Sequence, residues 1–188
     1  MGIDQSRMVK EGAQRVLDNR PERLFTVGLR CTIEGFDYSD IECWETAWRT
    51  YCREVDAVCA RRLLGEVQYF VRVLRQYDLR SFSLFPHGCR RLSHDESQIL
   101  NFIVCLQKVD AAAADIAVRV LLGNAAQCHP VNLKHLLAAG RAVADAFTAH
   151  GLFFIPLGQD VLDALTGKSN AICPACPPAE MLQFPKFN

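Results

Sequence analysis

The sequence predicts a mainly α-helical domain with about six to seven helices in orthogonal or bundle-like packing. Half of the 188 residues are hydrophobic, which is enough for a sizeable core. Apolar residues recur every three or four positions along most of the chain, as on the buried face of a helix. We assign residues 1–172 to this single domain and residues 173–188 to an extended C-terminal tail. The tail is rich in proline, with Pro174, Pro177, Pro178 and Pro185.

The N-terminal part contains the one segment whose pattern favours a strand. A helix is expected over residues 6–19, and Pro21 is expected to end it. Residues 24–34 then alternate apolar and polar side chains, the pattern of a half-buried strand, although the apolar spacing also fits a short helix. Because a strand must pair with another strand, residues 82–85 and 152–157 are its candidate partners. A small two- or three-stranded sheet is therefore an open alternative within the helical domain.

Two long helices are expected next. Ser39 and Glu42 have the spacing of a capping box, which predicts that a helix begins there. The apolar stripe that follows is interrupted near Asp56 and resumes as a second helix that ends before Tyr77. Residues 79–92 contain proline and glycine and are expected to form a connector.

The middle of the chain predicts a buried central helix. Ser93 and Glu96 form a second capping box at the start of the helix that precedes it. Residues 111–122 are apolar on almost every side of the expected helix, and only Asp115 and Arg119 provide a polar, solvent-exposed edge. A helix with so little polar surface is expected at the centre of the domain.

The last long helix is expected to begin at Pro130 and to end at Gly151. Small residues are frequent between positions 138 and 146. They would let another helix approach closely, either from the same chain or from a second one. A short helix is expected over residues 159–165.

Charge and hydropathy exclude several classes of partner. The 21 basic and 21 acidic residues leave no overall field that would attract nucleic acid or an anionic membrane. The charged residues of segment 34–56 are mostly acidic and those of segment 61–91 mostly basic. This pattern predicts that the two segments form neighbouring helices whose opposite charges pair, or else that the second segment presents a basic patch to a partner. No run of about 18 uncharged apolar residues occurs, and residues 1–20 lack the apolar block of a secretion signal. We therefore expect a cytoplasmic protein with no membrane and no nucleic-acid partner.

The nine cysteines are an odd number at irregular spacing, which predicts reduced thiols rather than a disulfide framework. Several of them lie on or beside apolar stripes and are expected to act as small core residues, namely Cys43, Cys52, Cys59 and Cys105.

Cys173 and Cys176 form a CxxC motif, in which two thiolates can reach one zinc ion or form one disulfide. A zinc or iron–sulfur site needs about four ligands, so we name His87 and Cys89 as candidate metal ligands beside them. The alternative complement is Cys128 with His129, and the alternative interpretation of the motif is an inert pair of thiols.

Motifs of catalysis are weak. The tripeptide at 167–169 resembles the end of a phosphate-binding loop, but Leu162 stands where the motif requires glycine. The chain contains no GxGxxG, GxSxG or HExxH sequence, so no catalytic residue is named and an enzyme is the less favoured class. Trp44, Trp48 and Tyr51 form an aromatic ridge that belongs either to the core or to a small-molecule pocket.

These observations favour a non-enzymatic helical regulatory or assembly protein that acts through protein–protein contacts, as a homodimer or with another protein. The alternative is a cysteine-based metal-binding or thiol-redox protein that uses the C-terminal CxxC motif. A second alternative is a helical protein that binds a small molecule near Trp48. No cofactor is required by the first interpretation, whereas zinc or an iron–sulfur cluster belongs to the second.

Overall fold

The computed structural model describes residues 16–77, 82–122 and 130–158. One 3-10 turn, η1 (Val16–Asp18), precedes six α-helices in this part of the chain. The helices are α2 (Arg20–Tyr38), α3 (Ile41–Glu54), α4 (Ala57–Tyr77), α5 (His94–Gln107), α6 (Ala111–Leu122) and α7 (Pro130–Ala149). The described residues contain no strand, so the prediction of a mainly α-helical domain is confirmed.

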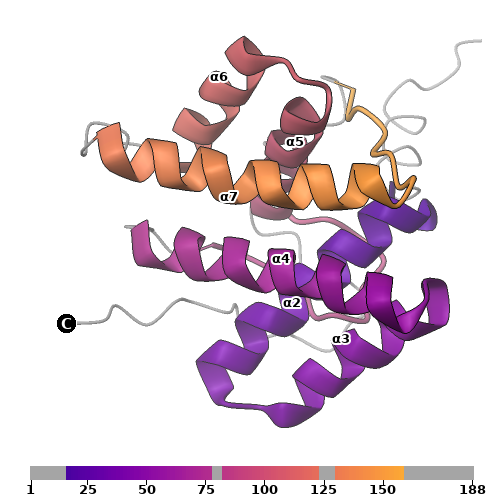
Figure 1. The fold of residues 1–188 in the computed structure, drawn as a ribbon. Helices are drawn as coiled ribbons and strands as arrows, with labels where there is room; N and C mark the ends of the chain where they lie inside the picture. The colour runs from indigo at the N-terminus through magenta and orange to yellow at the C-terminus, as the bar shows by residue number, and fades with distance from the viewer. Residues whose placement is uncertain (1–15, 78–81, 123–129, 159–188) are drawn as a thin grey trace, which may run out of the picture.

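The six helices pack together as a bundle around one core. Figure 1 shows α4 and α7 side by side across the middle of the molecule, with α5 and α6 beyond α7 and with α2 and α3 beyond α4. Helix α2 also contacts α5, which links the two sides. The aromatic side chains Phe25, Phe70 and Phe102 meet along this central line, with ring centroids 6.2 to 6.4 Å apart. Burial of such large apolar groups is the main driving force for this arrangement.

The predicted strand at residues 24–34 is wrong, because this segment is the middle of α2. Its alternation arose from polar residues that the fold buries, since Thr26, Arg30 and Thr32 are at most 2% exposed. A helix that is buried on nearly every side does not show a polar face in its sequence. Pro21 lies in the first turn of α2, so it begins this helix. Most of the helix predicted over residues 6–19 lies outside the described residues, and its described end is the 3-10 turn η1.

The proposed sheet partners are not strands either. Residues 82–85 and 152–157 are connectors without regular secondary structure, and some of their apolar side chains cover the core. Phe82, Leu84, Leu152 and Phe154 are all at most 6% exposed. The small sheet is therefore wrong, and hydrophobic burial explains the apolar residues that suggested it.

Local signals located the start of α5 and the interruption before α4 correctly, but they misassigned the start of α3. Both reciprocal hydrogen bonds of the capping box at Ser93 and Glu96 are present at the start of α5. The first predicted box is wrong, because Ser39 ends α2 with a left-handed φ of 54° and Asp40 caps α3 instead. Asp40 Oδ1 accepts a hydrogen bond of 2.8 Å from the backbone N–H of Glu42. Asp56, at the predicted interruption, accepts hydrogen bonds from two backbone N–H groups at the start of α4.

Helix α6 lies at the side of the bundle, so the prediction that it is the central helix is wrong. It packs mainly on α5, and Ile116 and Val120 remain 64% and 49% exposed. The predicted polar edge is present. Asp115 and Arg119 are both exposed, and Arg119 donates hydrogen bonds of 2.7 and 3.3 Å to Asp115. The sequence of α6 is therefore apolar on almost every side because one apolar face is buried against α5 and another apolar face is exposed.

The small residues of α7 serve a contact within the chain. A Cβ atom at Gly140 would lie 2.6 Å from Phe102 Cε1 and 2.7 Å from Leu106 Cδ1 on α5. Such a close helix–helix approach is possible only for glycine. Gly151, with a φ of 68°, follows α7 as predicted, and its N–H donates to the carbonyl of Thr148.

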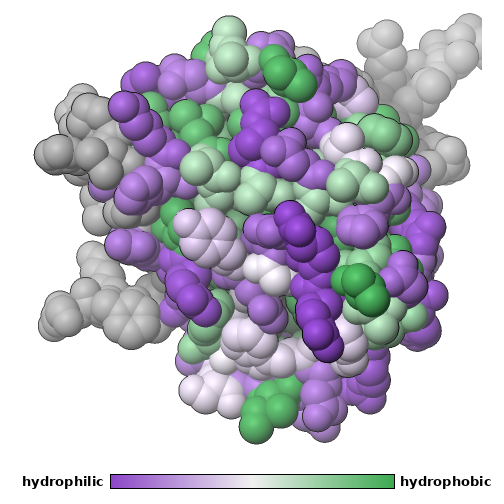
Figure 2. All heavy atoms as spheres, viewed as in Figure 1, coloured by the Kyte–Doolittle hydropathy of each residue, from purple (hydrophilic) through white to green (hydrophobic). Residues whose placement is uncertain are grey.

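The surface mixes polar and apolar side chains, as the space-filling view in Figure 2 shows for one face. Among the helices of residues 16–77, 82–122 and 130–158, none combines the length and apolar character that a membrane span requires. The C-terminal tail, residues 173–188, and the short helix predicted over residues 159–165 lie outside the described residues.

Candidate metal centre

A buried ion pair in the middle of α2 organises the region around the candidate site. Arg30 and Glu96 are both fully buried, and Arg30 Nε and Nη2 donate hydrogen bonds of 2.6 and 2.7 Å to the two carboxylate oxygens of Glu96. Arg30 also donates to the carbonyl oxygens of Pro86, Cys89 and Arg91, at 3.1, 2.5 and 2.5 Å. A guanidinium has five N–H donors in a rigid fork, and this arrangement uses that geometry to hold a stretch of backbone.

Glu96 is satisfied as fully as its partner. Its carboxylate accepts hydrogen bonds from the backbone N–H groups of Phe85 and Ser93, at 3.0 and 2.7 Å. A buried charge is tolerated when its hydrogen-bonding capacity is used in this way. The pair therefore fastens residues 86–91 to α2 and to the start of α5.

His87 lies at the corner of that fastened segment. The backbone N–H of Cys89 donates a hydrogen bond of 2.9 Å to the carbonyl of Pro86, which closes a turn around His87 and Gly88. Glu34 stands four residues after Arg30 on α2, on the same side of the helix. The turn consequently places His87 Nδ1 at 3.2 Å from Glu34 Oε2.

Cys43 reaches the same carboxylate from α3. Ser39, in its left-handed conformation, reverses the chain between α2 and α3, so the first turn of α3 lies back against the end of α2. Cys43 Sγ lies 3.4 Å from Glu34 Oε2 and 3.4 Å from Asp40 Oδ2. Three segments, α2, α3 and the connector, thus bring a carboxylate, a thiol and an imidazole together.

The cluster is covered on one side and open on the other. Cys43 is 9% exposed, whereas the side chains of Glu34 and His87 are 14% and 44% exposed. Burial raises the pKa of the Cys43 thiol, and the negative charges of Glu34 and Asp40 raise it further. Without a cation the thiol is therefore protonated at neutral pH, and its single S–H is shared between these two carboxylates.

Two of the three donor separations match those around a small transition-metal ion, and the third lies within 4.8 Å. One donor atom each from Glu34, Cys43 and His87 lies within 4.8 Å of the other two. Zinc–ligand bonds of about 2.0 Å for N and O and about 2.3 Å for S, at tetrahedral angles, give N···O edges of about 3.3 Å and S···O edges of about 3.5 Å. The observed separations of 3.2 Å for His87 to Glu34 and 3.4 Å for Cys43 to Glu34 match these edges. Asp40 contacts the thiol at 3.4 Å but is not a member of the cluster, so a water molecule is the candidate for the fourth ligand.

Only part of the predicted ligand set can be placed. His87 is a member of the cluster, but Cys89, which is buried, is not. Cys173 and Cys176 lie outside the described residues, as does the alternative pair at 128 and 129. The predicted convergence on the CxxC motif therefore stays a prediction.

Sequence reasoning missed Glu34 and Cys43. The available signal was the spacing of Asp40 and Cys43, three apart at the start of a helix, where both side chains face the same side. Glu34 gave no signal of its own, because it lies in the segment that was interpreted as a strand.

Most of the other described cysteines are packing residues, and of those predicted to be so, Cys59 is buried and Cys105 is half-buried. Cys31 is fully buried, and burial raises the pKa of this thiol to about 12. Burial also raises the pKa of Cys59 and Cys105. Cys52 differs from the prediction because its side chain is exposed on α3. These thiols, in contrast to Cys43, have no described metal-ligating cluster around them.

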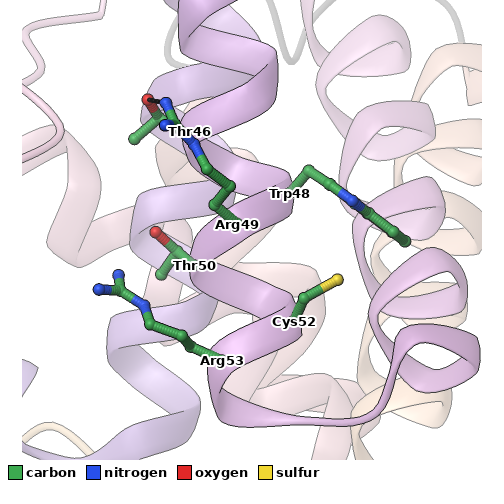
Figure 3. A pocket seen from close by; sticks show the side chains of 6 residues that line it. All are labelled: Thr46, Trp48, Arg49, Thr50, Cys52 and Arg53. Atoms are coloured by element: carbon green, nitrogen blue, oxygen red, sulfur yellow. Dashed lines mark hydrogen bonds between the residues drawn. The ribbon is translucent and has the colours of Figure 1, made fainter.

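The aromatic ridge divides between the core and the surface. Tyr51 is fully buried and donates a hydrogen bond of 2.8 Å to the carbonyl of Leu24, while Trp44 packs edge-on against Phe36. Trp48 lines a surface pocket of about 500 Å³ on α3. In Figure 3, Trp48 and Cys52 point to one side of this helix and the arginines at 49 and 53 point to the other. The described lining comes from a single helix, so it lacks the enclosing walls typical of a small-molecule site.

No family model matches the chain, and no curated protein sequence or solved structure matches it significantly. The functional argument therefore depends on the cluster of Glu34, Cys43 and His87 and on the fold that positions it.

Proposed function

We propose that the protein binds one divalent transition-metal ion, with Zn²⁺ the preferred ion, at Glu34, Cys43 and His87. The observation that carries this proposal is the position of the three donor atoms, which come from three separate segments and lie within 4.8 Å of one another. The domain is then a non-enzymatic helical protein in which the metal has a regulatory or structural role.

The types of donor favour zinc over the hard cations. A thiolate and an imidazole are ligands for Zn²⁺ and related transition metals, whereas Mg²⁺ and Ca²⁺ prefer oxygen ligands alone. On coordination the Cys43 thiol loses its proton to solvent, and the thiolate then binds the cation together with Glu34 and His87. The negative charges of Glu34 and the thiolate offset the charge of a divalent ion.

The arrangement supports a role in holding the fold or signalling metal occupancy. The ion would join α2, α3 and the connector, segments whose ligands lie up to 53 residues apart in the sequence. Structural zinc sites link distant segments in this way through four ligands. The cluster supplies three protein ligands from three segments, and water would fill the fourth position of a tetrahedral ion.

Metal analysis and cobalt substitution of the full chain test this proposal. Protein purified without chelator should contain about one zinc ion per chain, and its Co²⁺ form should show the visible bands of tetrahedral cobalt with a near-ultraviolet thiolate charge-transfer band. Cys43→Ser should abolish the thiolate band, and His87→Gln should weaken metal binding by at least about tenfold, as loss of a ligand does.

Matched variants separate this site from other thiols and imidazoles. Cys52→Ser changes an exposed cysteine on the same helix, and His150→Gln changes an exposed histidine after α7, so neither should alter metal content. Cys176→Ser tests the C-terminal motif directly. The proposal is wrong if the wild-type chain binds no metal, or if Cys176→Ser removes the metal while Cys43→Ser retains it.

We also propose that the exposed face of α6 contacts a second copy of the chain. Ile116 and Val120 form an exposed apolar pair four residues apart, flanked by Asp115 and Arg119. In an antiparallel pair of α6 helices these opposite charges would face each other across the contact. Sedimentation velocity should show a dimer that Ile116→Glu dissociates, and a monomeric wild-type chain at micromolar concentration would contradict this contact.

A further inference from the structure

The turn that carries His87 is held by interactions that involve no metal ligand. Arg30 contacts three carbonyl oxygens of residues 86–91, and its charge is matched by the buried carboxylate of Glu96. Neither Arg30 nor Glu96 belongs to the metal-ligating cluster. The position of the turn is therefore set by the core of the protein.

The remaining ligands are also positioned without a metal. Glu34 and Cys43 lie on helices α2 and α3, which pack on each other through buried residues such as Tyr51. The contacts of Glu34 with Cys43 and with His87 already have the donor separations of a tetrahedral site, and Cys43 and His87 lie within 4.8 Å of each other. Binding then costs little reorganisation, which is the condition for a preorganised site.

The open side of the cluster gives solvent access to the ion. His87 keeps 44% of its side-chain exposure, whereas Glu34 keeps only 14%. A structural zinc ion is commonly enclosed and its domain unfolds without it. Here the turn that carries His87 is held by buried hydrogen bonds of Arg30, while His87 itself is exposed to solvent.

We propose that Arg30 is a positioning residue that presets the His87 turn, so that the metal site exists in the metal-free protein and the ion exchanges with solvent without unfolding the domain. This inference rests on the proposed metal-binding function. It deepens that function by assigning the site to reversible, occupancy-dependent regulation. Occupancy of the site would then follow the concentration of available metal, and the bound ion would link the connector to α2 and α3.

The metal-free wild-type chain provides the first test. After removal of metal by a chelator, the chain should retain its helical circular dichroism and a cooperative thermal transition. Hydrogen exchange should show the Cys89 amide, which donates to Pro86, protected to a similar degree with and without Zn²⁺. Unfolding of the metal-free chain, or rapid exchange of this amide before metal is added, would overturn the inference.

Arg30→Lys tests the positioning role. Lysine keeps the positive charge but has three donors on a single nitrogen, so it cannot hold Glu96 and three carbonyl groups together. Zn²⁺ affinity, measured by competition with a chromogenic chelator, should fall by about tenfold or more, as for the loss of a group that orients a metal ligand. The thiolate band of the Co²⁺ form should remain, because Cys43 is unchanged.

Gly140→Ala is the matched control for general destabilisation, because it overpacks the contact between α5 and α7 and touches no residue of the site. It should lower the melting temperature while the Zn²⁺ affinity stays within about twofold of wild type. Equal affinities for Arg30→Lys and wild type would overturn the positioning role. If the Arg30 variant does not fold, the hydrogen-exchange measurement on the metal-free wild-type chain decides the inference.

The outcomes for the two proposals are distinguishable. A wild-type chain that binds no Zn²⁺ but protects the Cys89 amide contradicts the proposed metal binding, although the turn around His87 is then still held in place by Arg30. A chain that binds Zn²⁺ and unfolds on its removal supports metal binding and overturns the present inference.

Discussion

Replacement of Val109 by glycine should stabilise the protein. Val109 follows α5 with a φ of 60°, and its side chain is 74% exposed. Its N–H donates to the carbonyl of Leu106, and the N–H of Asp110 donates to the carbonyl of Cys105. This pair of bonds is the Schellman motif, in which the left-handed position after a helix is usually glycine. Valine is a poor residue there, because its branched side chain clashes with the backbone in this region.

The expected gain follows from two opposing terms. The left-handed conformation costs a residue with a Cβ atom about 1–2 kcal/mol. Glycine also gives the unfolded chain more conformational freedom, which lowers the free energy of unfolding by about 0.5–1 kcal/mol and offsets part of the relieved strain. Because Val109 is mostly exposed, the substitution removes little buried apolar surface. We therefore expect Val109→Gly to increase the free energy of unfolding by about 0.5–1 kcal/mol.

Urea unfolding followed by circular dichroism measures this change. With a denaturant slope of about 2 kcal/mol per molar, the midpoint should rise by about 0.2–0.5 M urea. Val58→Gly is the matched control, since Val58 is 80% exposed but lies in the helical first turn of α4. That variant should lose up to about 0.5 kcal/mol, because glycine is the poorer helix former. A Val109→Gly variant no more stable than wild type would refute the strain argument.

Two further predictions concern packing and pH. Gly140→Ala should lower the free energy of unfolding by about 1–3 kcal/mol, because the new Cβ would lie 2.6 Å from a ring carbon of Phe102; thermal unfolding checks this. Burial raises the pKa of Glu22 above 4.5, although a hydrogen bond from the backbone N–H of Ile155 opposes this effect. The stability that Glu22 contributes is therefore fully present below pH 4.5 and is lost as the pH rises through its folded pKa. Glu22→Gln, which cannot ionise, should be more stable than wild type at pH 7 and should show a smaller difference at pH 4; equal differences at both values would contradict the assignment.

Much of the helical architecture could be predicted because helix ends depend on nearby residues. The capping box of Ser93 and Glu96 is complete within one helical turn, and Pro130 and Gly151 act through their own backbone preferences. Asp56 interrupts α3 and α4 for the same local reason. The local signal failed at Ser39, which ends α2 in a left-handed conformation, and Asp40 became the cap of α3.

The candidate site shows the limit of sequence reasoning. His87 could be named as a possible ligand from its residue type, but its partners Glu34 and Cys43 could not. Their proximity depends on the packing of α3 on α2 and on the attachment of the connector to Arg30. Neither interaction leaves a periodic pattern in the sequence.

The sequence by itself therefore determined the helical class and most helix boundaries, because periodicity and capping involve residues within a few positions of each other. The tertiary structure alone decided that α2 is a helix buried on nearly every side, since Arg30 can be buried only with Glu96, which lies 66 residues away. It also decided that α6 lies at the side of the bundle and that three distant residues form one metal-ligating cluster. A buried charge and a shared ligand both depend on the position of a remote partner in space, which only the folded chain defines.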